Sequence, residues 1–67
     1  MLLKINGEEK NIIDSVSSIE KLLDYLKVES KMIVVEKNRE IIDKDTYSNT
    51  ILVSGDEVEL IRFMGGG

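Results

Sequence analysis

A single apolar stripe is the feature that most limits how this 67-residue chain can fold. Four apolar residues fall at positions i, i+3, i+4 and i+7, which predicts one amphipathic helix over about residues 18–27. One helix with one apolar stripe can cover only one face of one sheet. The stripe consists of Ile19, Leu22, Leu23 and Leu26.

The polar residues before the stripe predict where this helix begins. Ser17 and Glu20 have the spacing of a capping box, in which each side chain binds the free backbone N–H of the other residue. We therefore expect Ser17 to cap the helix.

Strand signals occupy most of the remaining chain. Residues 2–6 alternate weakly between apolar and polar side chains. The Asn6-Gly7 pair favours a type I′ hairpin turn, because both residues tolerate positive φ, and a second strand should follow at about residues 9–13. Further strands are predicted at residues 32–35, 40–42 and 57–63.

The last predicted strand carries apolar residues on both of its faces. Val58 and Leu60 lie on one face, and Ile61 and Phe63 on the other, which favours a central position in the sheet. In the polar segment before this strand, Tyr47 is the one expected core anchor. The order of elements predicts an α+β roll in which a mixed sheet of about five strands is covered on one face by one helix.

Composition excludes several classes of function. The chain has neither Cys nor His, so it lacks the usual general base near neutral pH and the commonest transition-metal ligands. Nine basic and thirteen acidic residues give a net charge of −4, which argues against nucleic-acid binding. No apolar run approaches the roughly 20 residues of a membrane span. We expect one small cytoplasmic domain.

The acidic residues do not indicate a metal site or an active site. They lack the spacing of an EF-hand loop, so solvated surface is the better interpretation. We also expect a domain of this size to have little room for a substrate pocket of ~300 Å³ or more, which makes an enzyme improbable. The residues considered are Asp43, Asp45, Asp56, Glu57 and Glu59.

The end of the sequence is its most informative part. Gly65, Gly66 and Gly67 bury no side chain and favour a mobile tail, so we divide the chain into a domain at residues 1–63 and a tail at residues 64–67. Such a tail can enter a slot too narrow for other sequences, and its terminal carboxylate is unhindered. Adenylation by ATP would activate that carboxylate for attack by a sulfur nucleophile. Because the chain has neither Cys nor His, partner proteins must supply both the activation and the sulfur.

Four features together resemble the sulfur carrier protein (ThiS) family of thiamine biosynthesis, which belongs to the ubiquitin-like β-grasp group. They are Asn6-Gly7 after a first strand, the apolar stripe of the helix, the run Gly55-Asp-Glu-Val-Glu-Leu60, and the terminal Gly66-Gly67. The resemblance covers essentially the whole chain. Two departures are Arg39, which stands where relatives often have Gly, and the absence of the proline common after the fourth strand.

The resemblance implies a β-grasp sheet with its first and last strands adjacent at the centre. It also implies that Gly67 becomes an acyl-adenylate and then a thiocarboxylate that donates sulfur to the thiazole ring of thiamine. Gly65 and Gly66 would enter the partner sites. The implied partners are an adenylating, E1-like enzyme that uses ATP and magnesium, thiazole synthase, and a sulfur donor such as a cysteine desulfurase. The chain would be their protein co-substrate rather than an enzyme.

Three other functions stay open at this point. The sulfur could go to the molybdenum cofactor or another acceptor, the chain could be a ubiquitin-like protein modifier, or it could be a binding module with an inert tail. We also expect Ile61, Phe63 and Met64 to dock partners beside the tail, because contiguous exposed apolar area marks interaction sites. Leu2 alternates with Leu3 and Ile5 along the first strand, so we expect it on the same face of the sheet as Ile61 and Phe63.

Overall fold

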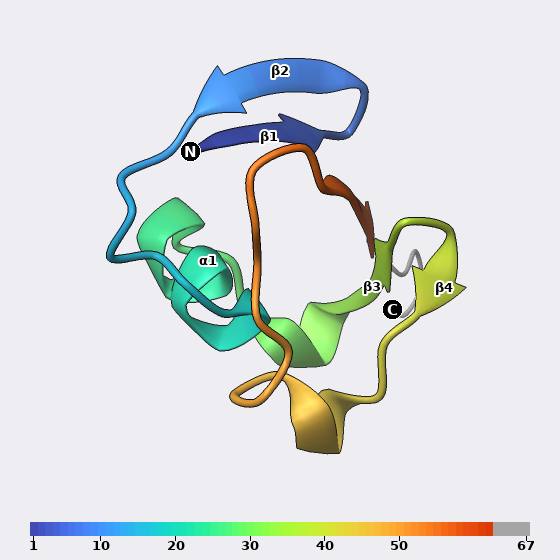
Figure 1. Cartoon of the computed structure of the whole chain (residues 1–67). Coiled ribbons are helices and arrows are strands. Elements are labelled where there is room, and N and C mark those ends of the chain that lie inside the picture. Colours follow the sequence, from blue (N-terminus) through green and yellow to red (C-terminus); the bar gives the residue numbers. More distant parts are fainter. Residues whose placement is uncertain (63–67) are drawn as a thin grey trace.

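The computed structural model describes residues 1–62, and the expected roles of Phe63, Met64, Gly65, Gly66 and Gly67 fall outside this range. One α-helix packs on one face of a five-stranded sheet (Figure 1). The strands are β1 (Leu2–Ile5), β2 (Glu8–Asn11), β3 (Ile33–Lys37), β4 (Glu40–Ile41) and β5 (Glu57–Arg62). The helix α1 spans Ile19–Leu26, and Ser30–Met32 and Lys44–Thr46 form short 3-10 helices.

The sheet has the strand order β2-β1-β5-β3-β4, so the last strand is central, as predicted. β5 runs parallel to β1 and antiparallel to β3, while the two outer pairs are antiparallel hairpins. In Figure 1, β1 and β2 lie at one end of the sheet and β3 and β4 at the other. This arrangement is the mixed sheet of a ubiquitin-like β-grasp fold.

Two tight turns close the outer hairpins with positive backbone angles. Asn6 and Gly7 have φ values of 50° and 84°, which confirms the predicted type I′ turn. Asn38 and Arg39 repeat this geometry between β3 and β4, with φ values of 51° and 72°. Arg39 therefore occupies a conformation that favours glycine.

The helix begins one residue later than expected, so the predicted capping box is wrong. Ser18 is the N-cap, and its Oγ accepts a hydrogen bond from the Lys21 backbone N–H at 3.2 Å. The reason is tertiary, because Ser18 forms a β-bridge with Ile51, and the Ser17 carbonyl accepts a hydrogen bond from Leu52. These contacts hold Ser18 extended and keep both serines outside the helix.

The core forms between α1 and one face of the sheet. Tyr47 is 6% exposed and is the predicted anchor of the segment before β5. The strand ends differ slightly from those expected: Ile13 lies beyond β2 and is exposed, and Met32 belongs to a 3-10 helix. No helix within residues 1–62 has the length and apolar character needed to cross a membrane. The most deeply buried side chains are Leu3, Ile19, Leu22, Ile33, Val35 and Val58.

Candidate functional site

The candidate site lies where β5 ends and the chain continues into its glycine-rich residues. Pairing with β3 extends to Arg62, which lies opposite Ile33. Pairing with β1 ends earlier, where Ile5 lies opposite Val58. We call Val34, Ile61 and Arg62 the tail root, because Ile61 and Arg62 are the last described residues of β5 and Val34 lies opposite Ile61.

One side chain extends the support of β5 beyond the end of β1. Asn6 Oδ1 accepts a hydrogen bond from the Leu60 backbone N–H at 2.8 Å. Asn6 is already in the hairpin turn, so its amide side chain occupies the place that the next β1 residue would take. The Asn6 backbone N–H also donates to the Val58 carbonyl at 3.0 Å. Asn6 thus holds the outgoing strand close to the tail root.

A buried carboxylate holds the beginning of the same strand. Asp56 is 5% exposed, and its two oxygens accept hydrogen bonds from Asn38 Nδ2 at 3.0 Å and from the Val53 backbone N–H at 2.9 Å. Asn38 Oδ1 accepts a further bond from the Glu57 backbone N–H at 2.9 Å. Because Asn38 directly follows β3 in the β3–β4 turn, this network sets the register of β5 against β3.

The face of the sheet opposite α1 has no covering element in the described part of the chain. We call it the uncovered face, and Ile61 lies on it, 45% exposed and directly opposite the half-buried Val34. Leu2 is also exposed on this face. However, β1 runs parallel to β5 with Lys4 opposite Glu57, the first residue of β5, so Leu2 lies near the beginning of β5 and not near its end. At ~3.3 Å per residue, Leu2 and Ile61 are about 20 Å apart along the strands. They do not form one patch.

An apolar groove of about 370 Å³ adjoins the tail root at the edge of β3. It exists because β4 pairs with only the last two residues of β3, which leaves the first part of β3 without a strand neighbour on the side away from β5. Burial is the main reason that the pKa of Tyr47 in this groove is raised above its usual value. The lining residues are Ile33, Val34, Ile41, Ile42, Asp43, Lys44 and Tyr47.

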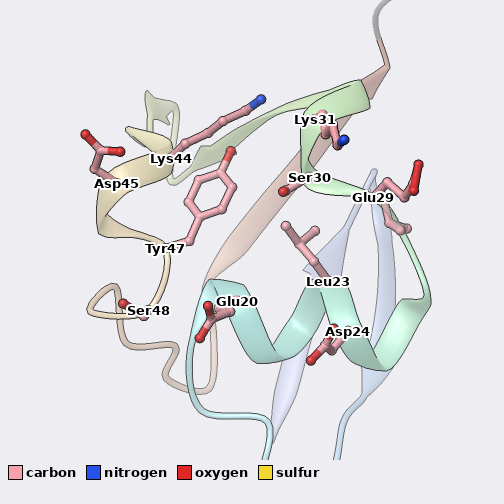
Figure 2. A pocket seen from close by; sticks show the side chains of 11 residues that line it. Glu20, Leu23, Asp24, Glu29, Ser30, Lys31, Lys44, Asp45, Tyr47 and Ser48 are labelled. Carbon is pink, nitrogen blue, oxygen red and sulfur yellow. The ribbon is translucent and has the colours of Figure 1, made fainter.

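A larger groove of about 620 Å³ lies between α1 and the two 3-10 helices (Figure 2). The expectation that the domain lacks room for a pocket of this size is therefore wrong. Leu23 and Tyr47 lie in the middle of the groove, Glu20 and Asp24 on its helix side, and Lys31 and Lys44 at the opposite side. No three acidic, His or Cys side chains within residues 1–62 converge as metal ligands would. The groove opens on the helix layer, away from the uncovered face.

Sequence analysis did not identify the side chains that hold β5. Asn6 was expected only as a turn residue, although Asn6 and Asn38 each bind the backbone of β5 through their side chains. A signal was present, since asparagine combines tolerance of positive φ with a side chain that can bind backbone groups. Which backbone group it binds depends on strands that are distant in sequence.

Known proteins resemble this chain along its whole length. The profile of the ThiS family matches residues 2–67. The sulfur carrier protein ThiS of Bacillus subtilis (strain 168) is 35% identical over 66 residues, which cover 98% of this chain and 100% of that protein. The crystal structure of the thiamine biosynthesis protein (ThiS) from Geobacter metallireducens superimposes with a TM-score of 0.87 and 35% identity, with 100% of both chains covered.

A longer protein also contains a similar segment. The thiazole synthase of Paramagnetospirillum magneticum (strain ATCC 700264 / AMB-1) is 43% identical to this chain over 67 residues. The match covers 100% of this chain but 20% of that protein, so the chain spans a fifth of its length.

Proposed function

This chain belongs to the ThiS family and is a sulfur carrier protein of thiamine biosynthesis, and we propose that Gly67 carries the sulfur as a thiocarboxylate. The single observation that supports this most strongly is the family match over residues 2–67, which includes the three terminal glycines. The chain has no Cys or His of its own to hold or activate sulfur. The carboxylate of Gly67 is therefore the reactive group of the proposal.

The proposed chemistry takes place in two steps on partner enzymes. The Gly67 carboxylate attacks the α-phosphorus of ATP, a C–O–P linkage forms, and pyrophosphate leaves. Magnesium and ATP are bound by the adenylating, E1-like partner. The sulfur donor, such as a cysteine desulfurase, carries its sulfur as a persulfide, and a thiol reduces that persulfide, is itself oxidised into a disulfide, and releases hydrosulfide. The hydrosulfide then attacks the acyl carbon. AMP leaves with the electron pair of the C–O bond, one proton is released, and the thiocarboxylate remains.

The chain itself contributes presentation rather than catalysis, so we propose that it is a co-substrate of its partners. β3 and Asn6 hold β5 from both sides, so the strand delivers Gly65 and Gly66 from a rigid base into a partner's slot. Ile61, together with Phe63 and Met64, would dock the partner beside the tail. The exposure of Ile61 on the uncovered face supports this role.

Thiazole synthase is the proposed acceptor of the sulfur. A protein named thiazole synthase contains a segment similar to the whole of this chain, which supports a physical association between carrier and synthase. ATP-dependent activation and a chain without disulfides both suit the cytoplasm, where we place the reaction.

Intact-mass measurement tests the proposal directly. The protein is incubated with ATP, magnesium, sulfide and the adenylating enzyme encoded in the same genome. We expect a mass increase equal to the difference between sulfur and oxygen, and no increase after deletion of Gly66 and Gly67. Thermal unfolding of the deletion variant checks that the domain is intact.

Two outcomes would contradict the proposed chemistry. A wild-type protein that gains no sulfur under these conditions would reject the carrier function of Gly67. Isopeptide-linked conjugates in place of a free thiocarboxylate would assign the chain to the protein modifiers instead.

A further inference from the structure

The groove of about 620 Å³ between α1 and the two 3-10 helices has no role in the proposed sulfur chemistry. Its volume falls within the roughly 300–1,000 Å³ range of small-molecule sites in proteins. Leu23 and the ring of Tyr47 lie in its middle, and charged side chains lie on both sides of them (Figure 2). An apolar middle with a few polar groups around it is typical of a site for a small ligand.

Tyr47 brings an unused hydrogen-bond donor into this groove. The residue is 6% exposed, and its hydroxyl points toward the side of the groove on which Lys31 and Lys44 lie (Figure 2). Burial raises the pKa of Tyr47, and contact with the Val35 backbone lowers it in part, as an N–H that donates to the phenolic oxygen does. None of the side-chain hydrogen bonds within residues 1–62 is donated by the Tyr47 hydroxyl. Because a buried tyrosine hydroxyl usually has a partner, this proton is available to a ligand.

Two lysines lie on the same side of the groove as this hydroxyl. Lys31 belongs to the first 3-10 helix and Lys44 to the second, and Ser30 adds a second hydroxyl to the lining. Neither lysine takes part in the three ion pairs of residues 1–62. Two ammonium groups and two hydroxyls supply donors for the three terminal oxygens of a phosphate monoester. This side of the groove therefore fits a phosphate better than a carboxylate, which has two oxygens.

The carboxylates of the groove disfavour a simple anion as the ligand. Glu20 and Asp24 lie on the helix side, opposite the lysines, and Glu29 and Asp45 also line the groove. With four carboxylates and two lysines, the lining repels a free anion. No ion pair within residues 1–62 joins these carboxylates to the lysines, so the opposite charges stay apart across the groove. A ligand that carries its own cation can satisfy both sides.

We propose that this groove binds a small zwitterion whose phosphate monoester and cationic group occupy opposite sides. Lys31, Lys44 and the Tyr47 hydroxyl bind the phosphate, and Glu20 and Asp24 bind the cation. Because Lys44 and Tyr47 also line the apolar groove beside the tail root, the bound ligand lies next to the surface proposed to dock partners. The site is separate from the terminal glycines, so the inference goes beyond the proposed function and does not depend on it.

Three probes separate the two halves of the proposed ligand. Thiamine monophosphate carries a thiazolium cation and a phosphate, thiamine carries the cation alone, and inorganic phosphate carries the anion alone. In NMR titrations of the isotope-labelled full chain, thiamine monophosphate should cause saturable shifts at the Leu23 and Ser30 amides, which belong to the groove. We expect thiamine and inorganic phosphate each to bind at least about tenfold more weakly, because each makes only half of the charged contacts.

Substitutions on the phosphate side test the assigned donors. Tyr47→Phe removes the hydroxyl but keeps the buried ring, and Lys44→Gln removes one ammonium group. Each should weaken thiamine monophosphate binding about 3- to 10-fold. Melting temperatures check that both variants are folded, and the exposed Lys44 tests the site even where loss of the Tyr47 hydroxyl disturbs the core. Lys10→Gln is the matched control, because Lys10 pairs with Glu8 on β2, outside the groove, and it should bind within about twofold of wild type.

Glu20→Gln should change the binding of two probes in opposite directions. It removes a negative charge from the groove, so inorganic phosphate should bind more tightly. It also removes a contact to the cation, so thiamine monophosphate should bind about 3- to 10-fold more weakly. A general effect of net charge would strengthen the binding of both probes, since both are anions overall.

Several results would overturn the inference. These are the absence of saturable shifts in the groove with thiamine monophosphate, equal affinities for thiamine monophosphate and thiamine, and an equal loss of affinity in Lys10→Gln and Lys44→Gln. Tighter binding of thiamine monophosphate by Glu20→Gln would reject the cation contact and with it the zwitterion. None of these results affects the gain of sulfur at Gly67, which the mass measurement reports separately.

Discussion

Replacing Asn6 by glycine would test whether its side chain holds β5 at the tail root. Glycine keeps the positive φ of 50° that this turn position requires, but it removes the oxygen that accepts the Leu60 N–H. The substitution therefore isolates the hydrogen bond from the backbone conformation. Asn6→Asp is the matched control, because it retains an acceptor oxygen at the same place.

The expected cost follows from the environment of this bond. A neutral hydrogen bond contributes about 0.5–1.5 kcal/mol, and this one is exposed to solvent, so the lower half of that range applies. Glycine also gives the unfolded chain more conformational entropy, which lowers the free energy of unfolding by a further ~0.4–1 kcal/mol. We expect Asn6→Gly to lower the free energy of unfolding by about 1–2 kcal/mol in urea titrations, and Asn6→Asp by less.

Hydrogen exchange shows where the stability is lost. The Lys4 amide donates to the Asp56 carbonyl at 3.0 Å, so it reports on the β1–β5 pairing that Asn6→Gly leaves in place. Its protection should fall only as far as global stability falls, about fivefold for each ~1 kcal/mol. The Leu60 amide loses its acceptor and should lose more protection than Lys4. Equal losses at both amides, or no loss at Leu60, would refute the reasoning.

Three further changes test other parts of the structure. Arg39→Gly should raise the free energy of unfolding by up to about 1 kcal/mol in urea, because relief of the positive φ of 72°, about 1–2 kcal/mol, exceeds the ~0.4–1 kcal/mol cost of glycine's freedom in the unfolded chain. A decrease would show that the Arg39 side chain stabilises the turn. The N-terminal ammonium, 2.9 Å from Asp14, lowers the pKa of that carboxyl, so its stabilisation is present above the ordinary pKa and is lost as pH falls through the lowered one. Asp14→Asn should accordingly melt below wild type at pH 7 and together with it in strong acid, whereas a gap that persists in acid would contradict the pairing. Leu22→Ala should cost ~2–5 kcal/mol because Leu22 is 0% exposed, while Ile61→Ala, at 45% exposure, should cost under about 1 kcal/mol and chiefly weaken partner association; equal losses of stability would place Ile61 in the core.

Local sequence by itself determined the elements and their orientation. The stripe of α1 predicted a single helix because its period matches 3.6 residues per turn, and three of its four residues are buried. Asn6-Gly7 predicted the first hairpin because few other pairs tolerate two positive φ values. The period of two in β5 predicted that Val58 and Ile61 would lie on opposite faces, and Val58 is buried while Ile61 is exposed. Each of these signals depends on a few neighbouring residues, so it can be recognised in the sequence without knowledge of the fold.

Tertiary structure decided what depends on pairing between distant segments. Ser18 rather than Ser17 caps α1 because the segment around Ile51 pairs with both serines. Leu2 and Ile61 share a face but not a patch, because β1 pairs with the beginning of β5. Register across β3 and β5 likewise sets Glu36 against Glu59. A strand shows which side chains share its own face, but only its neighbours determine what each side chain meets there, since register is a property of the whole sheet.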